Sequence, residues 1–297
     1  MIRIIPRLDI KGADLVKGIH LEGLRVLGSP ELFAQYYYEN GADEIFFQDV
    51  VASLFERNSL HQIISKTAQN IFIPITVGGG IRNLDDIGSV LRAGADKVSL
   101  NTAAIRNPSL IKEAVLYYGS STIVASIETI KQKNGEYLAF IDNGREHTGI
   151  EVLDWVKQVQ DMGAGEIVLT SVDREGTGEG FDIELLKKVN KSVSVPLIVH
   201  GGASSLSNIL DVINHGANAI ALGSILHYET IGQLKDVHSY NKEQGNRSFL
   251  INKGKRNNAY PQFSDHYFTG DYPVKPSDNL GEEKIKQLSL LSSKSSN

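Results

Sequence analysis

Two carboxylates in this sequence stand at the ends of apolar runs, where acid–base chemistry is readily placed. Asp9 closes the run IIPRLD, and Glu128 closes the run TIVASIE. If both runs are strands whose ends meet at one mouth, the carboxylates face each other over a ligand, where a positioned proton donor or acceptor is worth about 10²–10⁴ in rate. The alternative is a pair of solvated loop carboxylates. We favour the acid–base pair because the alternation along each run turns its last side chain inward.

Glycine-rich turns indicate a second kind of chemistry, the binding of anions by backbone N–H groups. Two such turns are Gly78–Gly80 and Gly201–Gly202, while Asn101–Thr102 and Gly223–Ser224 follow two further apolar runs. Free amides at turns or helix N-termini bind phosphate without net positive charge. Glycine often serves only a tight turn. Two equivalent sites, however, predict a ligand with a phosphate at each end.

Lys17 lies in the segment KGIHLEGLR, between the first apolar run and the next. We expect this segment to be a loop that closes over the ligand and brings the Lys17 cation to it. A solvated loop lysine is the alternative.

Four charged residues stand at the opposite ends of the apolar runs, where the runs begin. They are Arg3, Glu44, Lys97 and Glu166. Two cations and two anions meeting there form a neutral ring, which avoids the burial of an uncompensated ion. This ring is either a structural plug or a gate for a small polar molecule.

The elements that must position these residues are strands alternating with helices. Short runs rich in valine, isoleucine and leucine are each followed by a longer segment of helical period, a pattern typical of a parallel sheet. The eight predicted strands are Ile4–Asp9, Glu44–Val50, Ile73–Val77, Asp96–Leu100, Thr122–Glu128, Glu166–Val172, Val195–His200 and Asn218–Gly223. The predicted helices include Glu31–Asn40, Leu84–Ala93, Leu110–Tyr118, Val152–Met162 and Leu206–His215, and most end at glycine.

The chain also repeats itself. The segment GADEIFFQDV at Gly41 is similar to GAGEIVLTSV at Gly163. In the same way TVGGG is similar to IVHGG, and GADKVSLNT is similar to GANAIALGS. All three pairs are separated by about 122 residues, which indicates two four-stranded halves. The sequence therefore predicts an α/β fold, a (β/α)8 TIM barrel with an internal half-barrel repeat, over residues 1–244. An open, doubly wound sheet is the alternative, but it requires no such symmetry.

Composition excludes several classes of protein. The chain has 297 residues, a formal net charge of −5 and no cysteine, so a nucleic-acid partner, disulfides and thiolate metal sites are not expected. The histidines show no ligand spacing, and we expect neither a metal nor an organic cofactor. No apolar run approaches the roughly 18 residues of a membrane span, and MIRIIPRLDI does not resemble a signal peptide. We expect a cytoplasmic protein with no membrane association.

Residues 245–297 differ in composition from the rest of the chain. They are rich in asparagine, lysine, serine and proline and end in SSKSSN. We expect a polar, partly disordered extension, with room for a short helix near Glu282–Leu291.

Several long motifs resemble one family. They include RLDIK, LVKG, TVGGGI, GADKVSLNTAAIRNPSLI, EHTGIEVLDWV, GAGEIVLTSVDREGTGEGFD and HGGA. From about residue 2 to residue 244 the sequence resembles the cyclase subunit of imidazole glycerol phosphate synthase, the HisF family. A related isomerase barrel shares the half-barrel repeat, but the ring of charges and the SLNTAAI run match the cyclase better.

The resemblance implies an activity and a partner. In that family a glutaminase subunit (HisH-like), bound at the N-terminal face of the barrel, releases ammonia. The ammonia passes through the barrel interior and reacts with a bis-phosphorylated ribulosyl formimino-carboxamide ribonucleotide. The products are imidazole glycerol phosphate and aminoimidazole carboxamide ribotide, so the family enzyme is a lyase of histidine biosynthesis, and its two subunits form a heterodimer.

The resemblance also assigns roles to residues. The family's acid–base pair falls on Asp9 and Glu128, its channel gate falls on the four charged residues named above, and Asp96 matches a position at the partner interface. The substrate and phosphate contacts it implies are Lys17, Gly80, Asn101, Thr102, Thr170, Glu175, Gly201, Gly202, Gly223 and Ser224.

The sequence departs from the family pattern inside the mouth. Glu128 and Glu175 each replace an aspartate, while Gln48 and His200 put polar groups where apolar or small residues are usual. Arg7 replaces a small residue and, by alternation from Asp9, faces inward.

A buried Arg7 requires a partner, and we expect Asp9 or Glu128 to provide it. The pairing would lower the pKa of that carboxylate and weaken it as a base.

Three functions therefore follow. The first is the histidine-pathway cyclase with an altered site. The second keeps the ammonia supply and changes the acceptor to a surface-polysaccharide sugar that is amidinated. The third is a catalytically silent barrel that activates a partner amidotransferase.

Overall fold

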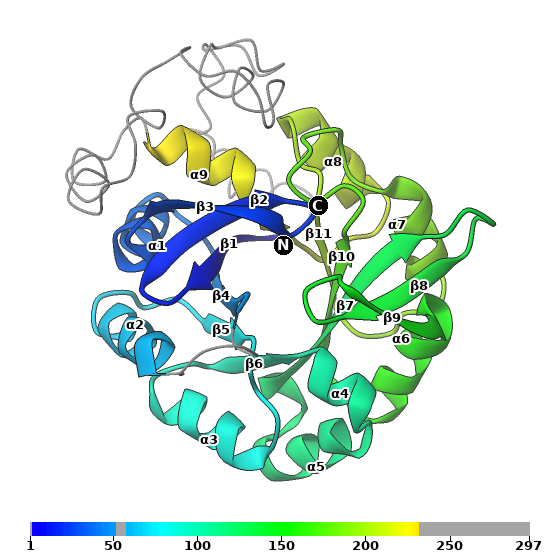
Figure 1. Ribbon diagram of the computed structural model, residues 1–297, viewed down its shortest axis with the longest axis horizontal. Coiled ribbons are helices and arrows are strands. Elements are labelled where there is room, and N and C mark those ends of the chain that lie inside the picture. The colour runs from blue at the N-terminus through cyan, green and yellow to red at the C-terminus, as the bar shows by residue number, and fades with distance from the viewer. Residues whose placement is uncertain (1, 52–57, 232–297) are drawn as a thin grey trace, which may run out of the picture.

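Eight parallel strands form a closed ring at the centre of the molecule (Figure 1). The computed structural model describes residues 2–51 and 58–231. The barrel strands are β1 (Arg3–Lys11), β4 (Ile45–Asp49), β5 (Ile75–Gly78), β6 (Lys97–Leu100), β7 (Ile123–Lys131), β10 (Glu166–Ser171), β11 (Leu197–His200) and β12 (Ala219–Leu222). The ring closes because β1 pairs in parallel with both β4 and β12. The predicted TIM barrel is confirmed, and each predicted strand overlaps an observed one.

Helices surround the barrel and bury their apolar faces against it (Figure 1). They are α1 (Pro30–Glu39), α2 (Asn58–Ala68), α3 (Leu84–Arg92), α4 (Thr102–Arg106), α5 (Ser109–Tyr118), α6 (Val152–Asp161), α7 (Ile183–Asn190), α8 (Leu206–Asn214) and α9 (Ser224–Ile231), with a 3₁₀ turn at Ser120–Thr122. Side-chain caps start several of them: Asn83 accepts the N–H of Asp86 at α3, and Ser205 accepts that of Asn208 at α8. None of the helices in the described part of the chain is long and apolar enough to cross a membrane.

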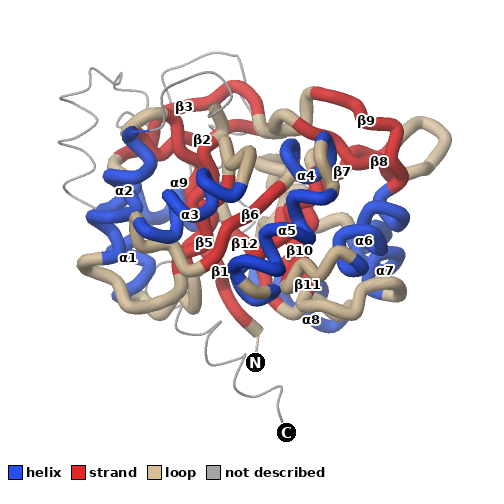
Figure 2. Tube along the Cα trace, turned by 90° about the horizontal axis from the view of Figure 1, so that it is seen from below, coloured by secondary structure: helices blue, strands red, loops and turns tan. Residues whose placement is uncertain are grey.

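Two hairpins extend the barrel at corresponding places in its halves. The strands β2 (Asp14–Ile19) and β3 (Glu22–Gly28) follow β1, while β8 (Tyr137–Ile141) and β9 (Glu146–Glu151) follow β7. Figure 2 shows both hairpins at the end of the barrel opposite the N-terminus. The sequence analysis did not predict these strands, and its loop around Lys17 is wrong, because Lys17 lies on β2.

The barrel interior is layered. A charged layer at the N-terminal end is followed by an apolar layer composed of Ile5, Phe46, Val124, Val168, Ile198, Ala219 and Ala221. Above it, toward the C-terminal strand ends, the inward side chains become polar. The buried polar side chains that could carry out chemistry therefore lie at the mouth, and the apolar layer separates them from the charged layer at the N-terminal end.

The expected boundary at residue 244, the extension 245–297 and the helix near Glu282–Leu291 lie outside the described residues.

Candidate active site

Asp9 is buried and fully engaged with cations. One carboxylate oxygen, Oδ1, accepts from Nε of Arg7 at 3.1 Å, and the other, Oδ2, accepts from Nζ of Lys17 at 2.8 Å. Burial by itself would raise the pKa of Asp9, but Lys17 and Arg7 outweigh it and hold this pKa well below its usual range. Each oxygen of Asp9 therefore contacts a cationic side chain, and its expected place in an acid–base pair stays a prediction. The expected pairing of Arg7 with a mouth carboxylate is confirmed.

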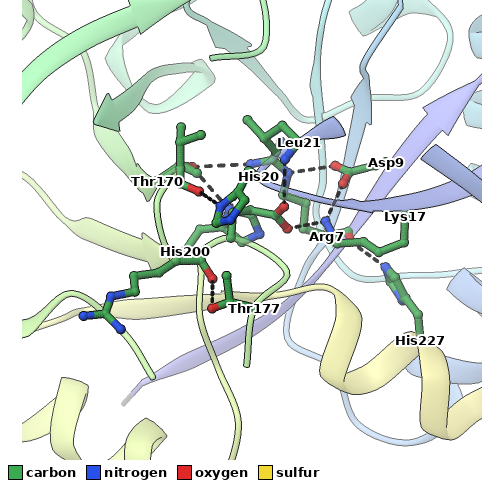
Figure 3. Close-up of polar contacts among 12 residues, drawn as sticks. Arg7, Asp9, Lys17, His20, Leu21, Thr170, Thr177, His200 and His227 are labelled. Carbon is green, nitrogen blue, oxygen red and sulfur yellow. Dashed lines mark hydrogen bonds and ion pairs between the residues drawn. The ribbon is translucent and has the colours of Figure 1, made fainter. Parts of the chain in front are cut away.

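Among the described residues, Arg7 is the largest charged side chain that is fully buried, with 1% of its surface exposed. Its Nη1 lies 3.1 Å from Nδ1 of His200 and 3.4 Å from Oγ1 of Thr170 (Figure 3). Burial, together with the Arg7 and Lys17 charges, lowers the pKa of His200 well below its usual value, so His200 is neutral and accepts this bond. The second terminal nitrogen, Nη2, has no hydrogen-bond partner.

Lys17 joins the β2 strand to the loop after β10. Its ammonium contacts Asp9 and the carboxylate of Glu175, and all three side chains are almost completely buried. The other oxygen of Glu175 accepts the backbone N–H of Leu21 at 3.2 Å, at the turn between β2 and β3. Lys17 is thus part of an ion-pair network and not a solvated loop residue.

His227 on α9 fixes the backbone at Arg7. Its Nε2 donates to the carbonyl oxygen of Arg7 at 2.9 Å (Figure 3). Its Nδ1 therefore accepts from the hydroxyl of Tyr37 at 2.7 Å. Burial lowers the pKa of His227 to about 3, which keeps it in this neutral form. The sequence analysis missed this residue.

Glu128 differs from Asp9 in its surroundings. Its Oε2 accepts the backbone N–H of Gly144 at 2.8 Å, and the side chain lines a cavity of about 350 Å³. Burial raises the pKa of Glu128 to about 7, against the opposing effects of Arg7 and of the Gly144 N–H. Glu128 therefore has the properties of a proton donor and acceptor at neutral pH.

The cavity at Glu128 contains one of the expected anion sites. Gly80, Asn101 and Thr102 line it, as do Gln48 and two exposed arginines, Arg82 and Arg106. The amide nitrogens of Asn101 and Asn143 each donate to a backbone carbonyl, which leaves the Oδ1 atom of each buried and unpaired. The sequence analysis did not single out Asn143, Arg82 or Arg106, although the Asn143-Gly144 dipeptide is a turn signal.

The second expected anion site lies in the other half of the barrel. Gly201, Gly202, Gly223 and Ser224 line a smaller cavity, of about 10 Å³, together with Glu175 and His200. Gly202 has a φ of 99°, and a Cβ atom there would lie 2.2 Å from the carbonyl oxygen of Gly180. Only glycine combines a positive φ with the absence of a Cβ atom, and without a side chain it leaves the backbone N–H groups uncovered.

The four charges at the N-terminal end form a closed ring. Glu44 lies 2.8 Å from Arg3 and 2.9 Å from Lys97, and Glu166 lies 3.1 Å from Arg3 and 3.2 Å from Lys97. Glu44 also accepts the hydroxyl of Thr76 at 2.6 Å. Every cation touches both anions, as the sequence pattern predicted.

Asp96 is exposed and has a structural contact of its own. Its Oδ2 accepts the backbone N–H of Ile75 at 2.8 Å. Asp43 and Asn218 hold Ile4 and Leu197 in the same way, so this contact ties adjacent strands together at the N-terminal end. Its match to a partner-interface position stays a prediction.

The described residues contain no cluster of side chains suited to a metal ion. A parallel barrel with two glycine-lined cavities and a buried carboxyl of raised pKa at one mouth defines a class, the barrel enzymes with their active site at the C-terminal face.

Comparison with known proteins identifies the family within this class. Residues 3–232 match the family described as "Histidine biosynthesis protein". The imidazole glycerol phosphate synthase subunit HisF of Legionella pneumophila is 55% identical over 205 residues, which is 69% of this chain and 97% of that protein. Those of Bifidobacterium adolescentis and Thermobifida fusca are 44% and 42% identical, over 80% and 82% of this chain and 95% and 97% of theirs. The chain belongs to the HisF family.

Proposed function

We propose that this chain is the cyclase subunit of an imidazole glycerol phosphate synthase and uses ammonia from a HisH-type glutaminase. Its substrate is then the bis-phosphorylated ribulosyl formimino-carboxamide ribonucleotide. The observation that supports this most strongly is Glu128, a buried carboxyl with a pKa of about 7 in a cavity that also contains Gly80, Asn101 and Thr102.

The geometry supports distinct roles for the two carboxylates. Glu128 gives and takes protons, because its pKa lies near neutral pH and its side chain lines a cavity. Asp9 remains an anion that holds Lys17 and Arg7 in place. The division follows the general pattern in which different surroundings separate the pKa values of two carboxylates and thereby their roles.

The larger glycine-lined cavity, of about 350 Å³, has room for one phosphate, whereas the second, of about 10 Å³, must widen to take the other. Backbone amides at Gly80 and Thr102 serve one end of the substrate, and those at Gly202 and Ser224 serve the other. The charged ring of Arg3, Glu44, Lys97 and Glu166 lies at the opposite end of the barrel, where a glutaminase partner would deliver ammonia.

Ammonium-dependent turnover tests this function. The purified chain, given the ribonucleotide and ammonium chloride at alkaline pH, is expected to form aminoimidazole carboxamide ribotide. Rescue of a histidine auxotroph that lacks the cyclase is the corresponding test in cells. Absence of both product and rescue would exclude the histidine-pathway function.

One observation favours a second candidate, the ammonia-dependent amidination of a surface-polysaccharide sugar. Arg7 and Lys17 both engage Asp9, so one of the two family acid–base positions is occupied by side chains. A changed interior combined with a retained charge ring fits a changed acceptor. Failure to rescue the auxotroph, together with ammonium-dependent modification of a sugar nucleotide, would support this candidate over the first.

A further inference from the structure

Arg7 has a buried hydrogen-bond donor that the protein leaves unused. Nε binds Asp9, Nη1 binds Thr170 and His200, and Nη2 has no partner. A buried guanidinium N–H without an acceptor is unfavourable, because it has lost its water and gained nothing in return. A ligand atom that accepts a hydrogen bond would remove this penalty.

The position of Arg7 identifies where such an atom would lie. The guanidinium stands over the ring of Phe46, 5.6 Å from its centroid, and Phe46 belongs to the apolar layer inside the barrel. Arg7 is therefore directly above the part of the interior through which a small neutral molecule would arrive. Nη2 shares one edge of the planar guanidinium with Nε, which points to Asp9, two residues nearer the mouth.

Glu128 lies within the electrostatic reach of Arg7. Among the charges that act on Glu128, Arg7 has the largest effect. The Arg7 charge therefore acts on the carboxyl that the proposed function uses as proton donor.

We propose that Nη2 of Arg7 donates a hydrogen bond to the carbonyl oxygen that ammonia attacks, and stabilises the negative charge that develops on this oxygen. This inference rests on the proposed function, in which the ribulosyl group supplies the ketone. The ammonia lone pair forms the new C–N bond while the C=O π electrons move to oxygen. Protonated Glu128 then gives its proton to this oxygen and takes one from nitrogen. A further transfer of the same kind releases water and leaves a C=N bond.

Replacement of Arg7 separates this catalytic role from a structural one. Arg7→Met removes the charge and all donors, and Arg7→Gln removes the charge but keeps a polar side chain. We expect either variant to lower kcat for ammonium-dependent turnover by about 10²–10³, the usual effect of removing one such donor, with little change in the KM for ammonium. Arg92→Met, an exposed arginine on α3, is the matched control and should keep the wild-type kcat.

The possible outcomes are distinct. A folded Arg7→Met variant, checked by circular dichroism, that keeps kcat within about twofold of wild type overturns the inference alone, because a merely structural residue affects the melting temperature without selectively lowering kcat. If Arg7→Met does not fold, Arg7→Gln is judged by the same criterion. A wild-type protein that does not use ammonium and the ribonucleotide at all removes the proposed function, and the inference with it.

Discussion

At the scale of single residues, the site depends on the contrast between Asp9 and Glu128. Both carboxylates are buried, but Asp9 lies between two cations, whereas Glu128 receives one backbone N–H and lines a cavity. The same burial therefore leads to opposite pKa shifts. The sequence analysis identified both residues and predicted the Arg7 pairing. It did not predict the Lys17 contact, because that depends on a hairpin it did not recognise.

In the proposed function, Glu128 is expected to control the pH dependence of activity. We expect kcat for ammonium-dependent turnover to change with an apparent pKa near 7, the value to which burial raises Glu128. Glu128→Gln cannot exchange a proton and should lose about 10²–10⁴ in rate across the whole pH range. Glu184→Gln, at an exposed position on α7, is the control. Full activity in Glu128→Gln would instead show that Glu128 does not transfer the proton.

Asp9 is expected to contribute to stability. Asp9→Asn leaves Arg7 and Lys17 without their shared anion, and removal of one partner from a buried pair costs about 3–5 kcal/mol. The folded-state pKa of Asp9 is depressed, so its contribution is fully present at pH 7 and is lost only as pH falls below the ordinary value of 3.8. Urea unfolding at pH 7 and at pH 3 measures both effects. An Asp9→Asn variant as stable as the exposed control Asp211→Asn would contradict this.

At the scale of elements, each of the two hairpins holds one carboxylate at the mouth of the barrel. Four described residues other than glycine have positive φ, namely His20 and Leu21 in the first hairpin turn, and Asp142 and Asn143 in the second. The two pairs are separated by the same interval of about 122 residues as the sequence repeats. Leu21 N–H binds Glu175, and Gly144 N–H binds Glu128. Each half-barrel therefore uses its hairpin turn to fix one carboxylate at the mouth.

The hairpins also show why the sequence predicted the barrel and missed part of the site. The barrel strands are buried apolar runs and stand out from their flanks, whereas β3 and β9 are partly exposed and polar. Asn134-Gly135 and Asn143-Gly144 are hairpin signals in the second half. The first half has no such dipeptide at His20-Leu21. The first hairpin could be predicted only by extending the repeat of about 122 residues from the strands to the turns between them.

The glycine turn after β11 provides a prediction at this scale. Gly202→Ala adds a methyl group 2.2 Å from the carbonyl oxygen of Gly180, at a φ of 99°. We expect weaker binding of inorganic phosphate and a free energy of unfolding lower by about 1–3 kcal/mol. Gly119→Ala is the matched control, because Gly119 has a φ of 89° but open space around it. Equal losses in the two variants would mean that backbone conformation, and not the close approach, requires glycine at residue 202.

At the scale of the whole molecule, the barrel separates two charged layers by an apolar one. The ring of Arg3, Glu44, Lys97 and Glu166 is neutral as a set, with two cations and two anions. The apolar layer above it offers no partner for an ion. An ammonium ion entering from this end would lose its water without compensation, whereas neutral ammonia would lose much less. If ammonia enters at this end, as the proposed function requires, the arrangement favours transfer of its unprotonated, nucleophilic form.

The ring itself gives the last prediction. Lys97→Met leaves Glu44 and Glu166 to share Arg3 as their remaining cation in the ring, so the N-terminal end gains net negative charge and binds ammonium more tightly. We expect the chain, assayed with a HisH-type glutaminase, to make less product from glutamine, while turnover with ammonium chloride changes little, since ammonia in bulk solution also reaches the mouth directly. The ratio of the two rates measures the effect. Lys66→Met, at an exposed position on α2, should leave this ratio unchanged. If Lys97→Met lowers both rates equally, the ring acts on the fold and not on the delivery of ammonia.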